Sequence, residues 1–393
     1  MPKLINIRSF KDFFNSSSSS GIVLFACLFL SLVIANSPWG EGFNNLLHTQ
    51  LGFENETLHL RYSVALWIND GLMAIFFLLV GLEIKREVVE GELSSPKKAI
   101  LPIICAVGGA IVPALIYAFF NGGTTTAAGW GIPMATDIAF ALAILSLVSK
   151  KVPISLKIFL AALAIVDDLL AILVIAIFYS SELHYMNLIY AGVILGILFL
   201  FNRFGVKNIA FYLIPGLLVW YFVHHSGIHA TIAGVLVALT LPTTEDDTES
   251  PLEKLEHLLT KPVSFLIVPV FALANTNIRF EDGMVEGLFT GLGMGIVLGL
   301  IIGKPVGIIL ISWLSVKLKI SQLPDQARWI HIVGVGLLAG IGFTMSIFIS
   351  ILSFADPLQV QEAKFSILVG SFLSGFLGYM LLNYSGKTKG ETK

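Results

Sequence analysis

Long apolar runs recur along the whole chain and restrict its possible folds more than any other feature. Hydrophobic residues make up 56% of the 393 positions, and charged residues only 13%. A soluble domain carries roughly 25% charged residues, so lipid rather than water must be the main solvent of this surface. The net charge of −2, without a basic face or a run of stacking aromatics, gives no indication of nucleic-acid binding. The sequence therefore predicts an all-α polytopic membrane protein.

A spanning helix needs about 20 apolar residues, and about twelve segments of the chain meet or approach that length. The first segment is followed by Asn36-Ser37-Pro38 rather than by a small-residue cleavage site, so we expect an uncleaved span and not a signal peptide. The twelve expected spans are 21–36, 64–84, 99–120, 129–148, 154–179, 186–202, 207–224, 228–242, 262–277, 287–314, 330–352 and 363–384.

The distribution of basic residues predicts the orientation, because cytoplasmic loops carry an excess of Lys and Arg. With alternating loops, twenty of the 24 Lys and Arg residues fall on the side of the two termini. Only Arg61, Arg279 and Lys364 fall on the other side, and Lys304 lies inside a span. We therefore expect both termini in the cytoplasm.

The loops leave no room for a soluble catalytic domain, so an enzyme is not expected. The longest outer loop, about 37–63, should contain a small hairpin over 51–60. The longest inner loop, about 243–261, is acidic at its start and has room for one or two helical turns over 252–259. The prediction is a single transmembrane domain over residues 1–393.

Two adjacent acids, Asp167 and Asp168, fall near the middle of the expected span 154–179. A charge at that depth is expensive and is usually functional. Neighbouring residues on a helix point about 100° apart, so one acid can face a water-filled cavity while the other faces a partner helix. The alternative is a pair of purely structural carboxylates.

Lys304 is the only cation at comparable depth, and an Asp of the 154–179 helix is its expected counter-ion. A purely structural ion pair is the alternative, because a buried pair need not do chemistry. The glycines at 291, 295, 299, 303 and 307 are spaced four apart and predict close packing against another helix.

Gly131 and Pro133 interrupt the expected span 129–148 just before Asp137, and a second interruption is expected within 336–346. Irregular backbone at membrane depth is tolerated only where protein buries it or where it lines a cavity. Asp137 can neutralise the positive N-terminal ends of the half-helices, and Thr136 with freed carbonyls can help to coordinate a cation. Paired interrupted spans are typical of transporters built from inverted repeats.

Seven segments carry a resemblance to the NhaA-type bacterial sodium/proton antiporters, and the resemblance extends over essentially the whole chain. The segments are Trp67–Asp70 (WIND), Phe77–Glu87 (FLLVGLEIKRE), Ala135–Ala141 (ATDIAFA), Ala164–Leu169 (AIVDDL), Ser226–Gly234 (SGIHATIAG), Leu300–Gly307 (LIIGKPVG) and Gly340–Phe348 (GIGFTMSIF).

The resemblance implies an inverted-repeat core made of the third to fifth spans, about 99–179, and the tenth to twelfth, about 287–384. The fourth and eleventh spans would be discontinuous helices that cross at mid-membrane, and the remaining spans would form a dimerisation and support panel. A homodimer held partly by the outer hairpin, about 45–62, is also implied.

For the site, the resemblance implies that Asp168 and Asp167 bind Na⁺ or Li⁺ with help from Thr136, and that Asp137 is the compensating charge at the crossing. No cofactor is implied beyond the transported ions. The segment 252–261 departs from the family pattern, which is richer in Arg and His. The residues implied to sense pH at the inner mouth are Glu83, Lys85, Arg86, Glu87, Glu256 and His257.

Carboxylates that bind either a proton or Na⁺ predict an exchange, and two protons per sodium would make it electrogenic. The second proton could travel on Asp167 or on Lys304. An intramembrane aspartyl protease is disfavoured, because its Gly-x-Gly-Asp pattern is absent and a buried lysine opposes a shared proton. A passive channel is a second alternative, but adjacent acids with a buried lysine suit a closed binding site better than a pore.

Overall fold

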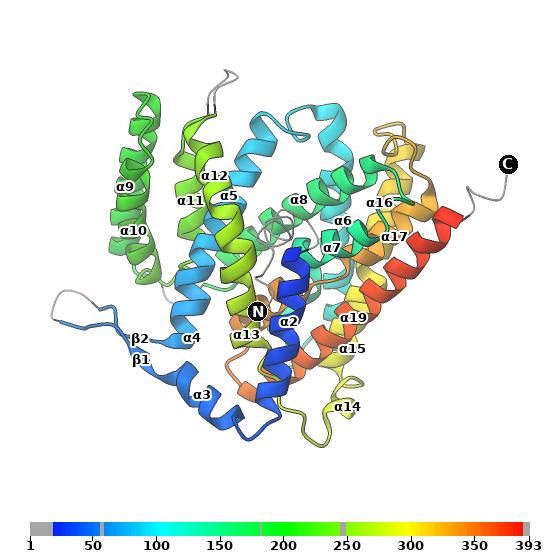
Figure 1. The fold of residues 1–393 in the computed structure, drawn as a ribbon, viewed down its shortest axis with the longest axis horizontal. Coiled ribbons are helices and arrows are strands. Elements are labelled where there is room, and N and C mark those ends of the chain that lie inside the picture. The colour runs from blue at the N-terminus through cyan, green and yellow to red at the C-terminus, as the bar shows by residue number, and fades with distance from the viewer. Residues whose placement is uncertain (1–18, 56–58, 181–182, 244–248, 388–393) are drawn as a thin grey trace, which may run out of the picture.

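The computed structural model describes residues 19–55, 59–180, 183–243 and 249–387, and about three quarters of this part of the chain is helical (Figure 1). In the first half the helices are α2 Ser19–Ala35, α3 Gly40–His48, α4 Val64–Leu66, α5 Met73–Val89, α6 Pro96–Asn121, α7 Ile138–Leu147, α8 Ile154–Phe178, α9 Tyr185–Arg203, α10 Ala210–His224 and α11 Ile232–Thr240. In the second half they are α12 Pro251–Pro262, α13 Val268–Thr276, α14 Met284–Gly287, α15 Gly291–Leu298, α16 Lys304–Lys317, α17 Trp329–Ala339, α18 Phe343–Ser353 and α19 Pro357–Lys387. Short π-helical or 3₁₀ segments are η1 Trp67–Leu72, η2 Ala127–Met134, η3 Val263–Ile267 and η4 Gly299–Gly303.

The fold is the expected polytopic bundle, but the expected count of twelve spans is not confirmed. Within the described residues, eight helices are long and apolar enough to cross a membrane, or up to ten if each of two bent pairs counts as one span. Helices α10 and α11, with 15 and 9 residues, fall short of the about 20 residues that a full crossing needs. One bent pair, α2 and α3, turns by 109°, and the other, α17 and α18, by 44°.

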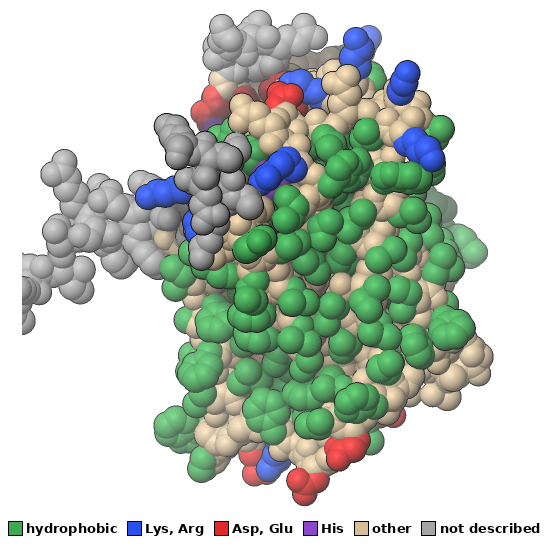
Figure 2. All heavy atoms as spheres, turned by 90° about the vertical axis from the view of Figure 1, so that its right-hand side faces the viewer, with side chains coloured by type: hydrophobic (Ala, Val, Ile, Leu, Met, Phe, Trp, Pro, Cys, Tyr) green, Lys and Arg blue, Asp and Glu red, His purple; other side chains and the backbone are tan. Residues whose placement is uncertain are grey.

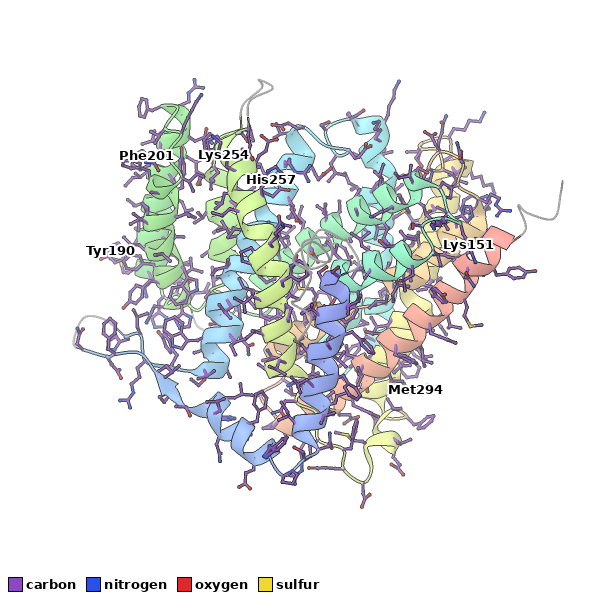
Figure 3. All side chains as sticks on the ribbon, viewed as in Figure 1. Lys151, Tyr190, Phe201, Lys254, His257 and Met294 are labelled. Carbon is purple, nitrogen blue, oxygen red and sulfur yellow. The ribbon has the colours of Figure 1, made fainter. Side chains whose placement is uncertain are left out.

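The molecular surface is divided as a membrane requires. Figure 2 shows a wide band of hydrophobic side chains, with Lys and Arg gathered at the upper end and mostly acidic residues at the lower end. Lys151, Lys254 and His257 lie toward the upper end, and Met294 lies in the lower half (Figure 3). The terminal residues 1–18 and 388–393, which carry part of the predicted positive charge, lie outside the described ranges.

Several helices extend beyond the expected spans. The largest consequence is for residues 251–261, which were expected to belong to an inner loop and form a helix instead. The segment predicted as a loop with one or two helical turns is a continuous helix from Pro251, which runs through α12, η3 and α13 to Thr276. Its start is stabilised by a capping box, in which the Ser250 hydroxyl accepts from Glu253 N and the Glu253 carboxylate accepts from Ser250 N. Glu256 and His257 therefore lie on a helix, and residues 244–248 lie outside the described chain.

The glycine stripe of α15, η4 and α16 packs along α6, as predicted. A Cβ atom on Gly303 would lie 2.8 Å from the Cα of Pro113, and a Cβ atom on Gly108 would lie 2.8 Å from the Gly307 carbonyl oxygen. Side chains at these positions would force the two backbones apart. This contact fixes α16, and hence Lys304, against α6.

The expected outer hairpin is present. Strands β1 Gln50–Leu51 and β2 Tyr62–Ser63 pair antiparallel, and an isolated bridge joins Glu54 to His59. Residues 56–58, between these two, lie outside the described ranges. Helix α3, which precedes the hairpin and follows the sharp bend after α2, was not predicted. The hairpin extends away from the helices at one end of the molecule (Figure 1).

Candidate ion site

Two interrupted helices meet inside the bundle, at the two places where the sequence predicted breaks. In the first, η2 ends at Met134, and an extended segment leads to α7. In the second, α17 ends at Ala339 and α18 begins at Phe343. The two breaks hydrogen-bond to each other: the Thr136 hydroxyl donates to the Ala339 carbonyl at 2.7 Å, and Asp137 N donates to the Ile341 carbonyl at 2.6 Å.

Asp137 connects the N-terminal ends of both following half-helices. It is the N-cap of α7, where its Oδ1 accepts from Phe140 N at 3.1 Å. Its Oδ2 accepts from the amide and the hydroxyl of Thr344 in the first turn of α18, at 3.0 and 2.6 Å. A carboxylate is favourable at helix N-termini because of their partial positive charge. The geometry is the one that charge compensation at the crossing requires.

Asp167 and Lys304 form the buried ion pair that the sequence predicted. Asp167 Oδ2 lies 2.6 Å from Lys304 Nζ, and both side chains are inaccessible to solvent. The lysine also donates to the Met134 carbonyl, which η2 leaves unpaired at the first break. The ammonium group therefore bridges α8 to the interrupted helix.

The neighbouring Asp168 is buried as well and lies close enough to Asp167, Glu83 and Asp137 to experience their charges. Among the described residues, the Oδ1 atoms of Asp167 and Asp168 are buried without a hydrogen-bond partner. Leaving a buried polar atom unsatisfied costs about 1–3 kcal/mol, and more for a charged group. Two such oxygens on adjacent residues suit a site that binds a proton or a cation in turn.

Thr136 adds a neutral oxygen beside these carboxylates, since it lies close enough to interact with Asp167 while its hydroxyl proton is donated to the Ala339 carbonyl. Over the described ranges, no three His, Cys, Asp or Glu side chains are arranged to hold a metal ion. A cation at this point would therefore rely on the two carboxylates supplemented by neutral oxygens. Oxygen ligands are those that hard cations prefer.

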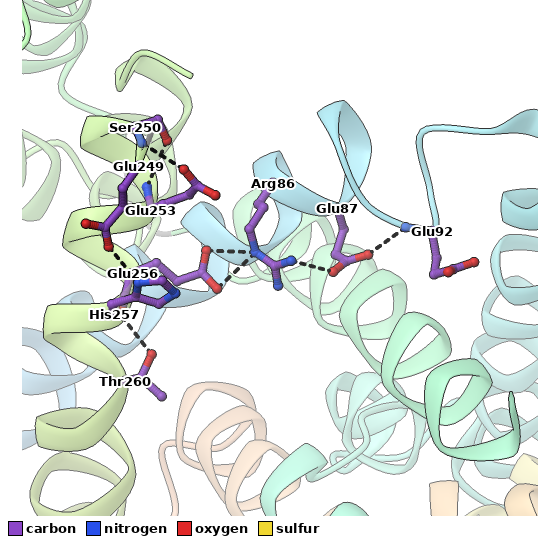
Figure 4. A network of polar contacts seen from close by, with 9 residues as sticks. All are labelled: Arg86, Glu87, Glu92, Glu249, Ser250, Glu253, Glu256, His257 and Thr260. Atoms are coloured by element: carbon purple, nitrogen blue, oxygen red, sulfur yellow. Dashed lines mark hydrogen bonds and ion pairs between the residues drawn. The ribbon is translucent and has the colours of Figure 1, made fainter. Parts of the chain in front are cut away.

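At the upper end of the bundle, Arg86 is the centre of a charged network (Figure 4). Its guanidinium contacts both oxygens of Glu256 on α12 at 2.9 and 3.0 Å, and Glu87 at 3.1 Å. Glu83, one turn earlier on α5, is close enough to experience the charges of Arg86 and Glu256. The network joins α5 to the start of α12.

The other two residues implied in pH sensing do not contact Arg86 directly. The Lys85 ammonium donates to the carbonyls of Leu239 and Leu241 at 2.8 and 2.5 Å, at the C-terminal end of α11. His257 is exposed and pairs with Glu249 at 2.8 Å. The structure thus brings Glu83, Arg86, Glu87 and Glu256 together, places His257 close enough to Glu256 for its charge to act on it, and leaves Lys85 apart.

A second buried cluster, around Asp70, was missed by sequence reasoning. Asp70 Oδ2 lies 3.1 Å from His224 Nδ1, and Oδ1 lies 3.6 Å from His229 Nε2. The His229 ring packs edge-on against Phe348 of α18. Three histidines within six residues, at 224, 225 and 229, were the available signal.

Comparisons with known proteins show relatives along nearly the whole chain. The family described as Na⁺/H⁺ antiporter 1 matches residues 11–382. The chain is 63% identical over 392 residues to Na(+)/H(+) antiporter NhaA 2 of Flavobacterium johnsoniae, covering 100% of this chain and 96% of that protein. It is 52% identical over 375 residues to Na(+)/H(+) antiporter NhaA of Flavobacterium psychrophilum, covering 95% and 96% of the two chains.

A solved structure shares the fold. The sodium proton antiporter MjNhaP1 from Methanocaldococcus jannaschii superposes with a TM-score of 0.51 over 93% of this chain and 91% of its own, at 15% identity. At that identity the likeness concerns the arrangement of helices alone.

Proposed function

The chain belongs to the Na⁺/H⁺ antiporter 1 family, and we propose that it expels cytoplasmic Na⁺ or Li⁺ in exchange for external protons, with Asp167 and Asp168 as the ion site. One observation carries the proposal. Two adjacent carboxylates with unpartnered oxygens are buried beside the crossing of two interrupted helices, and one of them is paired with Lys304.

The proposed exchange follows from competition for the same oxygens. Na⁺ entering from the cytoplasm displaces protons from the carboxylates, because each oxygen accepts either a proton or a cation. When the site opens outward, Na⁺ leaves and protons return. Thr136 and Asp137 keep the two breaks in contact and compensate the helix ends during this cycle.

Two protons per sodium would make each cycle move net positive charge inward, driven by about 2.3 kcal/mol per charge at 100 mV. The first proton is carried by Asp168. The second is carried either by Asp167 or by Lys304, which gives it up when Asp167 leaves the ion pair to bind Na⁺. Both routes use the 2.6 Å contact between the two side chains.

We further propose that the protein forms a homodimer in the bacterial inner membrane, with both termini in the cytoplasm. The core of the exchange is formed by the two repeats, 99–179 and 287–384, and the outer hairpin contributes to the dimer contact. Regulation by pH is assigned to the network of Arg86 with Glu83, Glu87 and Glu256, which is located at the positively charged end that we assign to the cytoplasm. No cofactor is required.

Uphill flux in proteoliposomes tests this function. A pH gradient alone should drive Na⁺ and Li⁺ accumulation against their own gradients, and the same vesicles should be tested with K⁺. A passive channel would only equilibrate the cations. Cation movement that never exceeds equilibrium would refute the antiport.

A further inference from the structure

An apolar cavity of about 450 Å³ lies on the surface formed by α6, η2 and α8, apart from the ion site. Its lining includes Ala110, Ala114 and Ala118, which are spaced four apart on one face of α6. The larger Ile111 and Leu115 lie beside them with 52% and 63% of their surface exposed. Small residues next to protruding large ones make a groove that is open along the side of the protein.

All the lining residues have uncharged side chains, and they belong to three candidate membrane spans. Leu170 and Val174 of α8 form part of the wall, and Trp130 and Met134 of η2 form another part. A groove of this composition in the spanning region faces lipid hydrocarbon rather than water. The occupant must therefore be an apolar chain.

The length of the groove, compared with the thickness of one lipid leaflet, indicates which kind of apolar chain it binds. From Val107 to Ala118 the lining rises along α6 by about 16 Å, at roughly 1.5 Å per residue. One leaflet contributes about half of the roughly 30 Å hydrocarbon core. We propose that this groove binds one acyl chain of a membrane lipid, which lies parallel to α6 across a single leaflet.

The groove does not include the two carboxylates, but one of its lining residues contacts Lys304 of the ion pair. An acyl chain bound in the groove therefore lies close to the ion pair. Met134 is one of the residues that line the groove, and its carbonyl accepts from Lys304. Leu170, on the opposite wall, follows Asp168 by two positions on α8. An acyl chain here packs against the interrupted helix at the point where Lys304 holds it. The inference goes beyond the proposed function and is independent of which group carries a proton.

Trp130 is a natural probe of the occupant, because brominated acyl chains quench tryptophan fluorescence on contact. The protein is reconstituted with brominated phosphatidylcholine and then exchanged into detergent, which removes loosely held lipid. The difference between the unmodified protein and Trp130→Phe isolates the emission of Trp130. We expect this emission to remain quenched after the exchange. Full recovery of it would mean that the lipid is only loosely held and would overturn the proposal.

Filling the groove gives the matched comparison. Ala114→Phe should abolish the retained quenching, whereas Ala210→Phe, at an exposed position on α10, should leave it unchanged. Retained quenching of equal size in both variants would contradict the site. If Ala114→Phe does not fold, Ala118→Leu replaces it, because Ala118 is exposed and tolerates added volume. Native mass spectrometry should then show one lipid fewer per chain for the groove variant than for Ala210→Phe, and equal lipid counts would also contradict the site.

Discussion

Asp137 and Thr344 lie 207 positions apart in the sequence, yet the Oδ2 atom of Asp137 accepts hydrogen bonds from both the amide and the hydroxyl of Thr344. The same carboxylate caps α7 through Phe140 N. One side chain therefore satisfies donors at the start of two half-helices from opposite halves of the chain. The crossing depends on this contact.

Replacing this side chain should destabilise the crossing. Asp137→Ala leaves three donors without their acceptor, at a cost of about 1–3 kcal/mol for each buried group left unsatisfied. We expect a lower melting temperature in detergent than for the unmodified protein. Thr344→Val removes only the hydroxyl of the partner and should produce a smaller shift. An unchanged melting temperature for Asp137→Ala would contradict the role of this carboxylate.

Lys304→Arg tests which group carries the second proton. Arginine can pair with Asp167 but cannot release a proton at accessible pH. If Lys304 carries a proton, exchange by this variant becomes electroneutral or stops, and this is the result we expect. The measurement is the charge moved per sodium on a supported membrane. An undiminished inward current relative to ion flux would instead leave both protons on the aspartates.

Glu256→Gln tests regulation at the charged network. Protonation would neutralise the Glu256 carboxylate that pairs with Arg86. The ion pair is therefore present only while Glu256 is ionised, and it is lost as the pH falls. Glutamine resembles the protonated form at every pH. We therefore expect the exchange of Glu256→Gln to vary less with pH than that of the unmodified protein. Glu281→Gln, which changes an exposed carboxylate between α13 and α14, should retain the original profile. Identical profiles for all three proteins would remove this network from regulation.

Deleting residues 51–60 tests the outer hairpin. Leu51 and Phe53, which lie in this segment, have 51% and 59% of their surface exposed and offer apolar area to a second copy. The deletion should weaken dimerisation and leave exchange nearly intact, because it removes none of the buried charges. Mass photometry in mild detergent measures the monomer fraction. A stable dimer after the deletion would show that the interface lies elsewhere.

Much of the site could be predicted from the sequence because burying a charge in a membrane is so expensive that few explanations remain. Asp167, Asp168 and Lys304 are recognisable by depth alone, and the pairing of Lys304 with an Asp of the same depth followed from the lack of another cation there, while the structure identifies that Asp as Asp167. Gly131 and Pro133 marked the first break, and the glycines at 340 and 342 marked the second. These features are local, so a single sequence contains them.

What could not be predicted depends on contacts between distant segments. The contact of Asp70 with His224 and His229 requires η1 to pack beside the turn after α10. The π-helical turns at η1, η3 and η4 have no clear signal in residue type. The helix from Pro251 is a different case, because the Ser250–Glu253 capping box is visible in the sequence. In that segment the many charged residues of α12 favoured the interpretation as a loop, so the helix was not predicted.

The central claim is that Asp167 and Asp168 bind a cation in exchange for protons, and proton release on adding Na⁺ tests it most directly. The purified protein in weakly buffered detergent solution should release protons when Na⁺ is added, and Asp168→Asn and Asp167→Asn should release none while remaining folded. Glu249→Gln, a surface carboxylate variant, should release as many protons as the unmodified protein. Appreciable sodium-driven proton release by either aspartate variant would contradict the assignment of these residues as the ion site.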